Sequence, residues 1–333
     1  METDEMMDRN ELVQEDNEQT VEDEKRAEAE TEKAEIQKVT AMAPFLGSKE
    51  TTATMMRDVA YALMPAALFG IYRFGFRAFL ILVLSVTSCV LTEHVCKRIR
   101  KAQNGGYECS AIVTGLLLGM MLPINVPRWF PVAAGVFAIG IMKMLFGGLG
   151  RNRLNPAAMG KCLFLVLAGP VMNISVSGYM VTWSDTKVED LFFGFGVGMA
   201  GEVSAFLILL GGLYLVMCKV ITFHGPVAYL LSFSAVILLF GEDGFDLNRL
   251  AMHLCIGGVM LGAFFLINDY STTPMTKSGK VLFGILAGAL TGVLRVLGFT
   301  VEAVAIAVVI GNCFVPLIDV LTLPKASRKR TGK

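Results

Sequence analysis

Long apolar segments constrain this chain most, because their length matches the roughly 20 residues that a helix needs to cross a bilayer. The chain has 333 residues, of which 54% are hydrophobic. Charged residues gather at the ends and in short connections between the apolar runs. This pattern predicts an all-α polytopic membrane protein. Ten candidate segments cover approximately residues 58–73, 76–96, 108–123, 129–147, 157–173, 200–220, 224–241, 249–268, 281–298 and 302–322.

The third and fifth segments are short for a complete span, which indicates tilted helices or helices broken near membrane depth. The flanking regions differ from the segments in composition. Residues 1–43 form an acidic tail with little apolar surface to bury, so we expect disorder or a solvated helix. Residues 44–323 form the expected membrane domain, and residues 324–333 form a basic tail. The formal net charge of zero averages these regions and carries no functional information.

Lysine and arginine predict the orientation, since they favour the cytoplasmic side of a plasma membrane. With ten spans and both termini cytoplasmic, most of the basic connections fall on one side. They comprise Lys97–Lys101, Arg151 and Arg153, Lys219, Lys277 and Lys280, and the C-terminal tail. Nine or eleven spans would place one of these clusters outside. The acidic N-terminus does not resemble a cleavable signal peptide.

The seven cysteines and three histidines lack the spacing of a metal site, and most cysteines lie inside apolar runs. Small buried side chains are the favoured interpretation. The sequence predicts no metal ligand and no nucleic-acid partner, and it identifies no catalytic residue.

An internal repeat relates the two halves of the membrane domain, at about residues 54–173 and 200–323. Thr114–Asn125 (TGLLLGMMLPIN) aligns with Gly257–Asn268 (GGVMLGAFFLIN), and Met159–Phe164 (MGKCLF) resembles Ile310–Val315 (IGNCFV). Because each half holds five segments, an odd number, the second half must enter the membrane from the opposite face. The expected fold is therefore about ten transmembrane helices as two inverted five-helix repeats.

Discontinuous helices in such folds usually frame a central pathway. Asn125 and Asn268 end the aligned segments and are candidates for an ion pathway. Asp58 and Glu202 are weaker candidates, because the default role of a carboxylate that opens a helix is to favour the N-terminal dipole. Lys143 is expected to snorkel to the cytoplasmic interface. Glu302 and Asp319, near segment ends, are weaker still.

The stretch GGLGRNRLNPAAMG, Gly147–Gly160, interrupts the apolar pattern. Its glycines suit a helix end, and Asn155 followed by Pro156 suits an N-cap and first helical position. Arg151 and Asn155 are also weak candidates for binding a cofactor or another anion beside this helix N-terminus. The turn-shaping role is the favoured one.

Several strings resemble, in order, the D subunit of Rnf-type electron transport complexes, a family related to the B subunit of the sodium-translocating NADH:quinone oxidoreductase. The strings are Met142–Gly160, Ser48–Ala78, Ser110–Pro123, Gly201–Leu215 and Thr272–Gly284. The resemblance covers about residues 44–323. It implies one component of a bacterial or archaeal plasma-membrane complex whose other subunits are its partners. Such a complex passes electrons between ferredoxin and NAD and drives Na⁺ or H⁺ across the membrane.

The resemblance also implies flavin. In the family, FMN is joined to a threonine of a Ser-Gly-Ala-Thr motif in the outward loop after the fifth span, and riboflavin is bound noncovalently. The corresponding loop here, Ala168–Gly194, lacks that motif. Thr182 and Thr186 are weak acceptor candidates, and loss of the covalent link is the favoured interpretation.

Two alternatives remain open at this point. An inverted five-plus-five repeat also suits a channel or transporter for a small polar solute, because fold alone does not determine function. The second alternative is a flavin-free paralogue that only scaffolds the same complex. Bound flavin and dependence on redox partners would distinguish the pump component from both.

Overall fold

The computed structural model describes residues 52–100, 108–147, 152–168, 187–195, 199, 204–241, 244–299 and 302–323. Every regular element in these ranges is helical, which confirms the predicted all-α class. The contacts described below lie within one compact unit, Glu50–Leu321. The predicted tails, residues 1–43 and 324–333, fall outside the described residues.

The first half contributes α2 (Thr52–Phe74), α3 (Phe76–Ile99), α4 (Glu108–Met121), α5 (Trp129–Val136), the π-helical segment η1 (Phe137–Leu145) and α6 (Pro156–Ala168). The second contributes α8 (Ala205–Met217), α9 (His224–Phe240), α10 (Leu247–Cys255), α11 (Val259–Leu261), the π-helical η3 (Gly262–Leu266), α12 (Lys277–Val296) and α13 (Ala303–Thr322). The short helix α7 (Val188–Phe193) lies between them in the chain.

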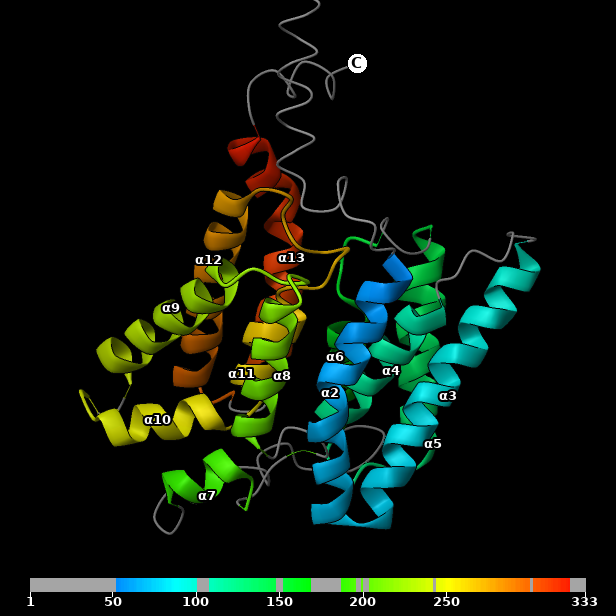
Figure 1. Ribbon diagram of the computed structural model, residues 1–333, viewed down its shortest axis with the longest axis horizontal. Coiled ribbons are helices and arrows are strands. Elements are labelled where there is room, and N and C mark those ends of the chain that lie inside the picture. The colour runs from blue at the N-terminus through cyan, green and yellow to red at the C-terminus, as the bar shows by residue number, and fades with distance from the viewer. Residues whose placement is uncertain are drawn as a thin grey trace, which may run out of the picture. The chain divides into compact units, whose positions relative to one another are not determined.

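Within each half, the neighbours in space follow a similar order (Figure 1). α3 packs against α4, α5 and η1, and α2 packs against α4. In the second half α9 packs against α12 and η3, and α8 contacts α11 and η3. α2 and α8 also pack against each other, so the halves meet along their first helices.

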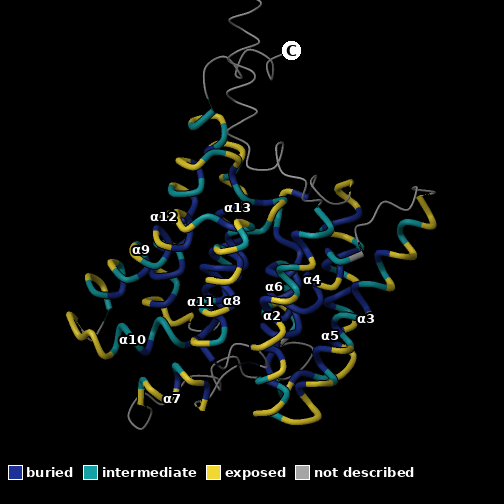
Figure 2. Tube along the Cα trace, viewed as in Figure 1, coloured by how far each residue is buried: buried dark blue, intermediate teal, exposed yellow. Residues whose placement is uncertain are grey.

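Two short helical segments are the most deeply buried, and two longer helices are much more exposed. Almost all of α4 and of the α11–η3 segment is buried, whereas α3 and α9 expose large parts of their surface (Figure 2). Short apolar helices cannot cross a bilayer alone, but their ends are tolerated at membrane depth when protein surrounds them. Exposed apolar side chains along α3, such as Phe76 and Leu91, suit contact with lipid.

Three helices in the described part of the chain are long and apolar enough to cross a membrane: α3, α12 and α13. A fourth span results if α10 and the α11–η3 segment are counted together, although they are bent by 66°. Each of the ten predicted segments contains a helix, but several are shorter than a complete span. The multi-pass membrane class is therefore supported, and ten spans remain a prediction.

The eighth predicted segment, 249–268, is interrupted between α10 and α11. Gly257 and Gly258 have φ values of 65° and 70° between α10 and α11. Glycine adopts this left-handed conformation without a Cβ penalty, so the paired glycines permit the sharp change of direction.

Candidate functional site

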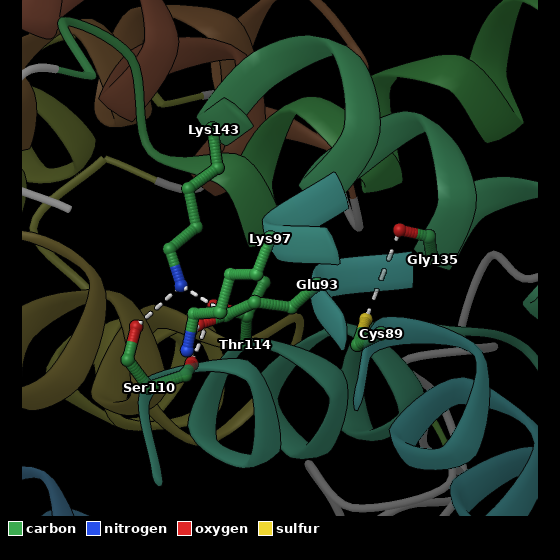
Figure 3. Close-up of polar contacts among 7 residues, drawn as sticks. All are labelled: Cys89, Glu93, Lys97, Ser110, Thr114, Gly135 and Lys143. Carbon is green, nitrogen blue, oxygen red and sulfur yellow. Dashed lines mark hydrogen bonds and ion pairs between the residues drawn. The ribbon is translucent and has the colours of Figure 1, made fainter. Parts of the chain in front are cut away.

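A buried cluster of charged and hydroxyl side chains lies where α3, α4 and η1 meet (Figure 3). The Lys143 ammonium is 2.6 Å from Glu93 Oε2 and donates a hydrogen bond of 2.7 Å to Ser110 Oγ. Lys143 is 2% exposed and Glu93 is 3% exposed. A charge at this depth is costly unless it is paired and hydrogen-bonded, and here each charge compensates the other.

The other carboxylate oxygen of Glu93 forms an ion pair of 3.0 Å with Lys97, one turn along the same helix. Glu93 thus lies between two cations, one from its own helix and one 50 positions away. The hydroxyl of Thr114 donates to the backbone oxygen of Ser110, one turn earlier in α4.

This cluster corrects the expectation that Lys143 snorkels, because its ammonium points into the protein toward Glu93. Glu93 was not among the sequence candidates. Its signal was present, since an acid inside an apolar segment is expensive and tends to be functional or paired. The basic run that follows, Lys97–Lys101, made it resemble a residue of the cytoplasmic connection.

Asn155 confirms the predicted N-cap of α6. Its Oδ1 accepts hydrogen bonds from the backbone nitrogens of Ala157 and Ala158, at 3.0 and 3.1 Å. Its Nδ2 donates to the carbonyl of Leu266, the last residue of η3, at 3.4 Å. Both ends of the amide therefore bind protein, and Asn155 joins the two halves. A contact of Asn155 with a cofactor stays a prediction.

A second buried cation lies at the C-terminal end of α4. The ammonium of Lys161, in α6, donates to the carbonyl of Met121 at 2.6 Å and lies 5.2 Å from the centre of the Phe164 ring. Lys161 is 1% exposed. Carbonyls at a helix C-terminus carry partial negative charge, which favours a cation there.

A third buried cation, Arg295 of α12, holds the break between α10 and α11. Its guanidinium donates to the carbonyls of Ile256 and Gly257, at 2.5 and 3.3 Å, and to that of His253 at 3.3 Å. These carbonyls have lost helical partners because the helix is interrupted. Neither Lys161 nor Arg295 was selected from the sequence, since their partners are backbone atoms that leave no sequence pattern.

The ion-pathway candidates that the structure describes do not converge on the cluster around Glu93 and Lys143. Asn125 is exposed after α4, where its Oδ1 accepts a long hydrogen bond from Arg77. Asn268 donates to the carbonyls of Ala263 and Phe264 and so caps its own segment. Asp58 lies six residues inside α2, which corrects the expectation that it opens the helix.

The remaining candidates are placed as follows. Asp319 accepts a hydrogen bond from the backbone nitrogen of Met275, and Glu302 is buried just before α13. Arg151, Thr182, Thr186 and Glu202 lie outside the described residues.

Asp269 follows the end of η3, outside the membrane-spanning segments. Burial raises the pKa of its carboxyl above the ordinary range, while hydrogen bonds from Ser271 and Thr272 and the positive charge of Lys143 lower it. Although its side chain is only partly buried by surface area, the chain surrounds the carboxyl closely enough for desolvation to dominate. Its electrostatic interaction with Lys143 places second-half charge close to the first-half cluster.

Comparison with known proteins covers most of the chain. The NQR2, RnfD, RnfE family matches residues 39–328. The chain is 36% identical to the D subunit of the Na⁺-translocating ferredoxin:NAD⁺ oxidoreductase complex of Acetobacterium woodii, over 86% of this chain and 94% of that one.

Two further relatives are similar over comparable lengths. The chain is 32% identical to the D subunit of the proton-translocating ferredoxin:NAD⁺ oxidoreductase complex of Clostridium ljungdahlii, over 84% of this chain and 93% of that one. The same values hold for the D subunit of the ion-translocating oxidoreductase complex of Stutzerimonas stutzeri.

Proposed function

The chain belongs to the NQR2, RnfD, RnfE family, and we propose that it is the D subunit of a membrane complex that couples electron transfer between ferredoxin and NAD⁺ to ion translocation. The observation that carries this proposal is identity of 36% spread over 94% of a relative with that name. The protein is then one component of a translocating oxidoreductase, and the other subunits of the complex are its partners.

The architecture supports this role. We propose that the membrane domain consists of two inverted five-helix halves with both termini in the cytoplasm of a bacterial or archaeal cell. Support comes from the corresponding packing of α3 with α5–η1 and of α9 with α12, and from the interrupted helix in the second half. In inverted repeats, interrupted helices present backbone groups to a pathway near the membrane centre.

For the ion pathway, we keep Asn125 and Asn268 as proposed contacts because each follows the end of a short, buried helical segment. Asp58 and Glu202 are proposed as weaker contacts. The relatives named above translocate different ions, Na⁺ in one and protons in another, so the test must measure both.

The test uses the complete complex in inverted membrane vesicles. Reduced ferredoxin and NAD⁺ are added, and uptake of ²²Na⁺ and acidification of the lumen are recorded together. Vesicles from cells that lack this chain are expected to lose ion uptake, and its re-expression should restore it. Ion uptake at the wild-type rate without the chain would contradict the proposal.

The solute-channel alternative is tested in liposomes that contain the full chain alone. Flux of a small polar solute through these liposomes, without redox partners, would favour that alternative over the pump component. The proposed role predicts that solute flux equals that of empty liposomes.

For the flavin, we propose that the complex contains FMN or riboflavin without a covalent link to this chain, because the Ser-Gly-Ala-Thr motif is absent. The chain is run on a denaturing gel after co-expression with a flavin transferase, and no fluorescent band is expected. A fluorescent band that disappears in Thr182→Ala or Thr186→Ala would establish covalent attachment instead. Absence of any flavin in the native complex would favour the scaffolding paralogue.

A further inference from the structure

An apolar groove of about 630 Å³ lies between α9 and α12, away from the charged cluster. Val227, Leu231 and Ser232 line it from α9, and Val281 and Ile285 line it from α12. The hydroxyl of Ser232 donates to the backbone carbonyl of Tyr229 within its own helix, at 3.0 Å. The groove therefore presents almost no hydrogen-bonding group to an occupant along most of its length.

The groove results from the way the two helices pack. Gly284 and Gly288 lie against the backbone of α9 at Gly225 and Tyr229, so the helix axes approach closely along this stripe. Contacts advance in the same direction along both helices, which means that α9 and α12 are parallel. Larger side chains on either side of the stripe then form the two walls.

One end of the groove is polar and cationic. His224, the first residue of α9, is exposed and lines the groove. Lys277, the first residue of α12, is exposed and lies four residues before Val281, hence one turn away on the same helix face. None of the residues that line the groove is acidic. The nearby carboxylate of Asp319, on α13, accepts a hydrogen bond from Met275.

This combination fits an amphiphile that has an apolar chain and an anionic head. We propose that the groove binds one acyl chain of an anionic glycerophospholipid, with the phosphate head group beside His224 and Lys277. Basic residues at the cytoplasmic end of a cleft between membrane helices are suited to such head groups.

The size of the groove suits one acyl chain. A volume of about 630 Å³ falls in the range of about 300–1,000 Å³ that holds a small molecule. The apolar floor also excludes a hydrophilic ligand such as a free nucleotide.

The test is native mass spectrometry of the full chain in mild detergent, titrated with phosphatidylglycerol or with phosphatidylcholine of the same acyl chains. We expect the wild type to retain one phosphatidylglycerol, bound more tightly than phosphatidylcholine. Lys277→Gln should weaken phosphatidylglycerol binding about five-fold, the effect of one surface cation near an anionic head group, and leave phosphatidylcholine binding unchanged.

Filling the groove tests the apolar part. Leu231→Trp should remove the bound lipid, and Val281→Trp repeats the test from the opposite wall in case one variant does not fold. Matched controls are Leu91→Trp and Arg98→Gln, which alter an exposed apolar and an exposed basic position on α3. Neither control should change lipid binding.

Two results would overturn the proposal. One is equal retention of phosphatidylglycerol in the wild type, Lys277→Gln and folded groove-filling variants. The other is an efficient cross-link from Leu231→Cys to another protein of the intact complex, which would assign the groove to a partner protein.

Discussion

Two helix pairs, α3 with α5–η1 and α9 with α12, pack closely through glycine but are joined by different polar contacts. In the first pair, a Cβ at Gly135 would overlap with Ser88 of α3. In the second, Gly284 and Gly288 approach the backbone of α9. Small residues at such crossings let helix backbones approach closely. Close packing matters in a membrane because lipid tails are as apolar as the side chains, so the hydrophobic effect does not drive helices together there.

The polar contacts between the helices differ in charge. Glu93 and Lys143 form a buried ion pair between α3 and η1. In the α9–α12 pair, Tyr229 and Thr291 share a neutral hydrogen bond of 2.9 Å, and the Thr291 hydroxyl also donates to the carbonyl of Ala287. The two pairs thus meet the same packing requirement with contacts of very different desolvation cost.

An apolar pair of similar volume often stabilises a protein as well as a buried ion pair does, because desolvation offsets the attraction. The ion pair between α3 and η1 is therefore weak evidence for a stabilising role. Glu93 also pairs with Lys97, and the charge of Lys143 acts on Asp269, so the ion pair is part of a larger group of interacting charges. The α9–α12 contact, in contrast, combines close helix packing with one neutral hydrogen bond.

The largest expected effect comes from breaking the ion pair on one side only. Lys143→Met leaves Glu93 buried with Lys97 as its remaining cation, and loss of one partner in a buried pair costs about 3–5 kcal/mol. We expect a value near the lower end of that range, about 3 kcal/mol. The measurement is thermal and denaturant unfolding of the full chain in detergent.

The double variant Glu93→Gln with Lys143→Met serves as the control, since it removes both charges and should recover most of the lost stability. Lys97→Met should cost at most about 1 kcal/mol, because that lysine is at the edge of the cluster. If the double variant were as unstable as Lys143→Met alone, the uncompensated charge would not be the cause.

The second effect compares a glycine at a close helix crossing, Gly288, with a glycine that has more space around it, Gly140. Gly288→Ala places a methyl group onto the backbone of Tyr229, where the neighbour cannot move cheaply, and should destabilise the chain by about 1–3 kcal/mol. Gly140→Ala in η1 meets only the Thr92 methyl at 3.4 Å and should be neutral or stabilising by up to about 1 kcal/mol. Unfolding in detergent measures both variants, and equal losses would show that close approach is not specific to Gly288.

Local patterns in the sequence predicted local structure well. Asn155 followed by Pro156 specified a helix start, because capping involves atoms two or three residues apart. Apolar runs also predicted the helices, because a helix is formed by residues that are close together in the sequence. The start of α2 was misplaced relative to Asp58, since an acid inside a helix and an acid at its start look alike in a sequence.

The sequence did not predict which residues far apart in the chain contact each other. The pairing of Glu93 with Lys143 spans 50 positions, and the contact of Asn155 with Leu266 spans 111. The sequence did not place the break at Gly257 and Gly258, because an apolar run that contains glycine is also compatible with a straight helix. Its stabilisation by Arg295 depends on the packing of α12 and on backbone carbonyls that carry no side-chain signature.

The smallest effect concerns pH and is confined to the charged region. Because burial raises the folded-state pKa of Asp269, the folded chain holds this proton more tightly than the unfolded chain does. The contribution to stability is complete below the ordinary pKa of aspartate and is lost as the pH rises through the raised value. Unfolding measured across this window should give a falling stability in the wild type and a flatter profile in Asp269→Asn. Ser271→Ala removes a hydrogen bond that lowers this pKa, so it should extend the fall to higher pH. An identical slope in the wild type and Asp269→Asn would show that another group titrates there.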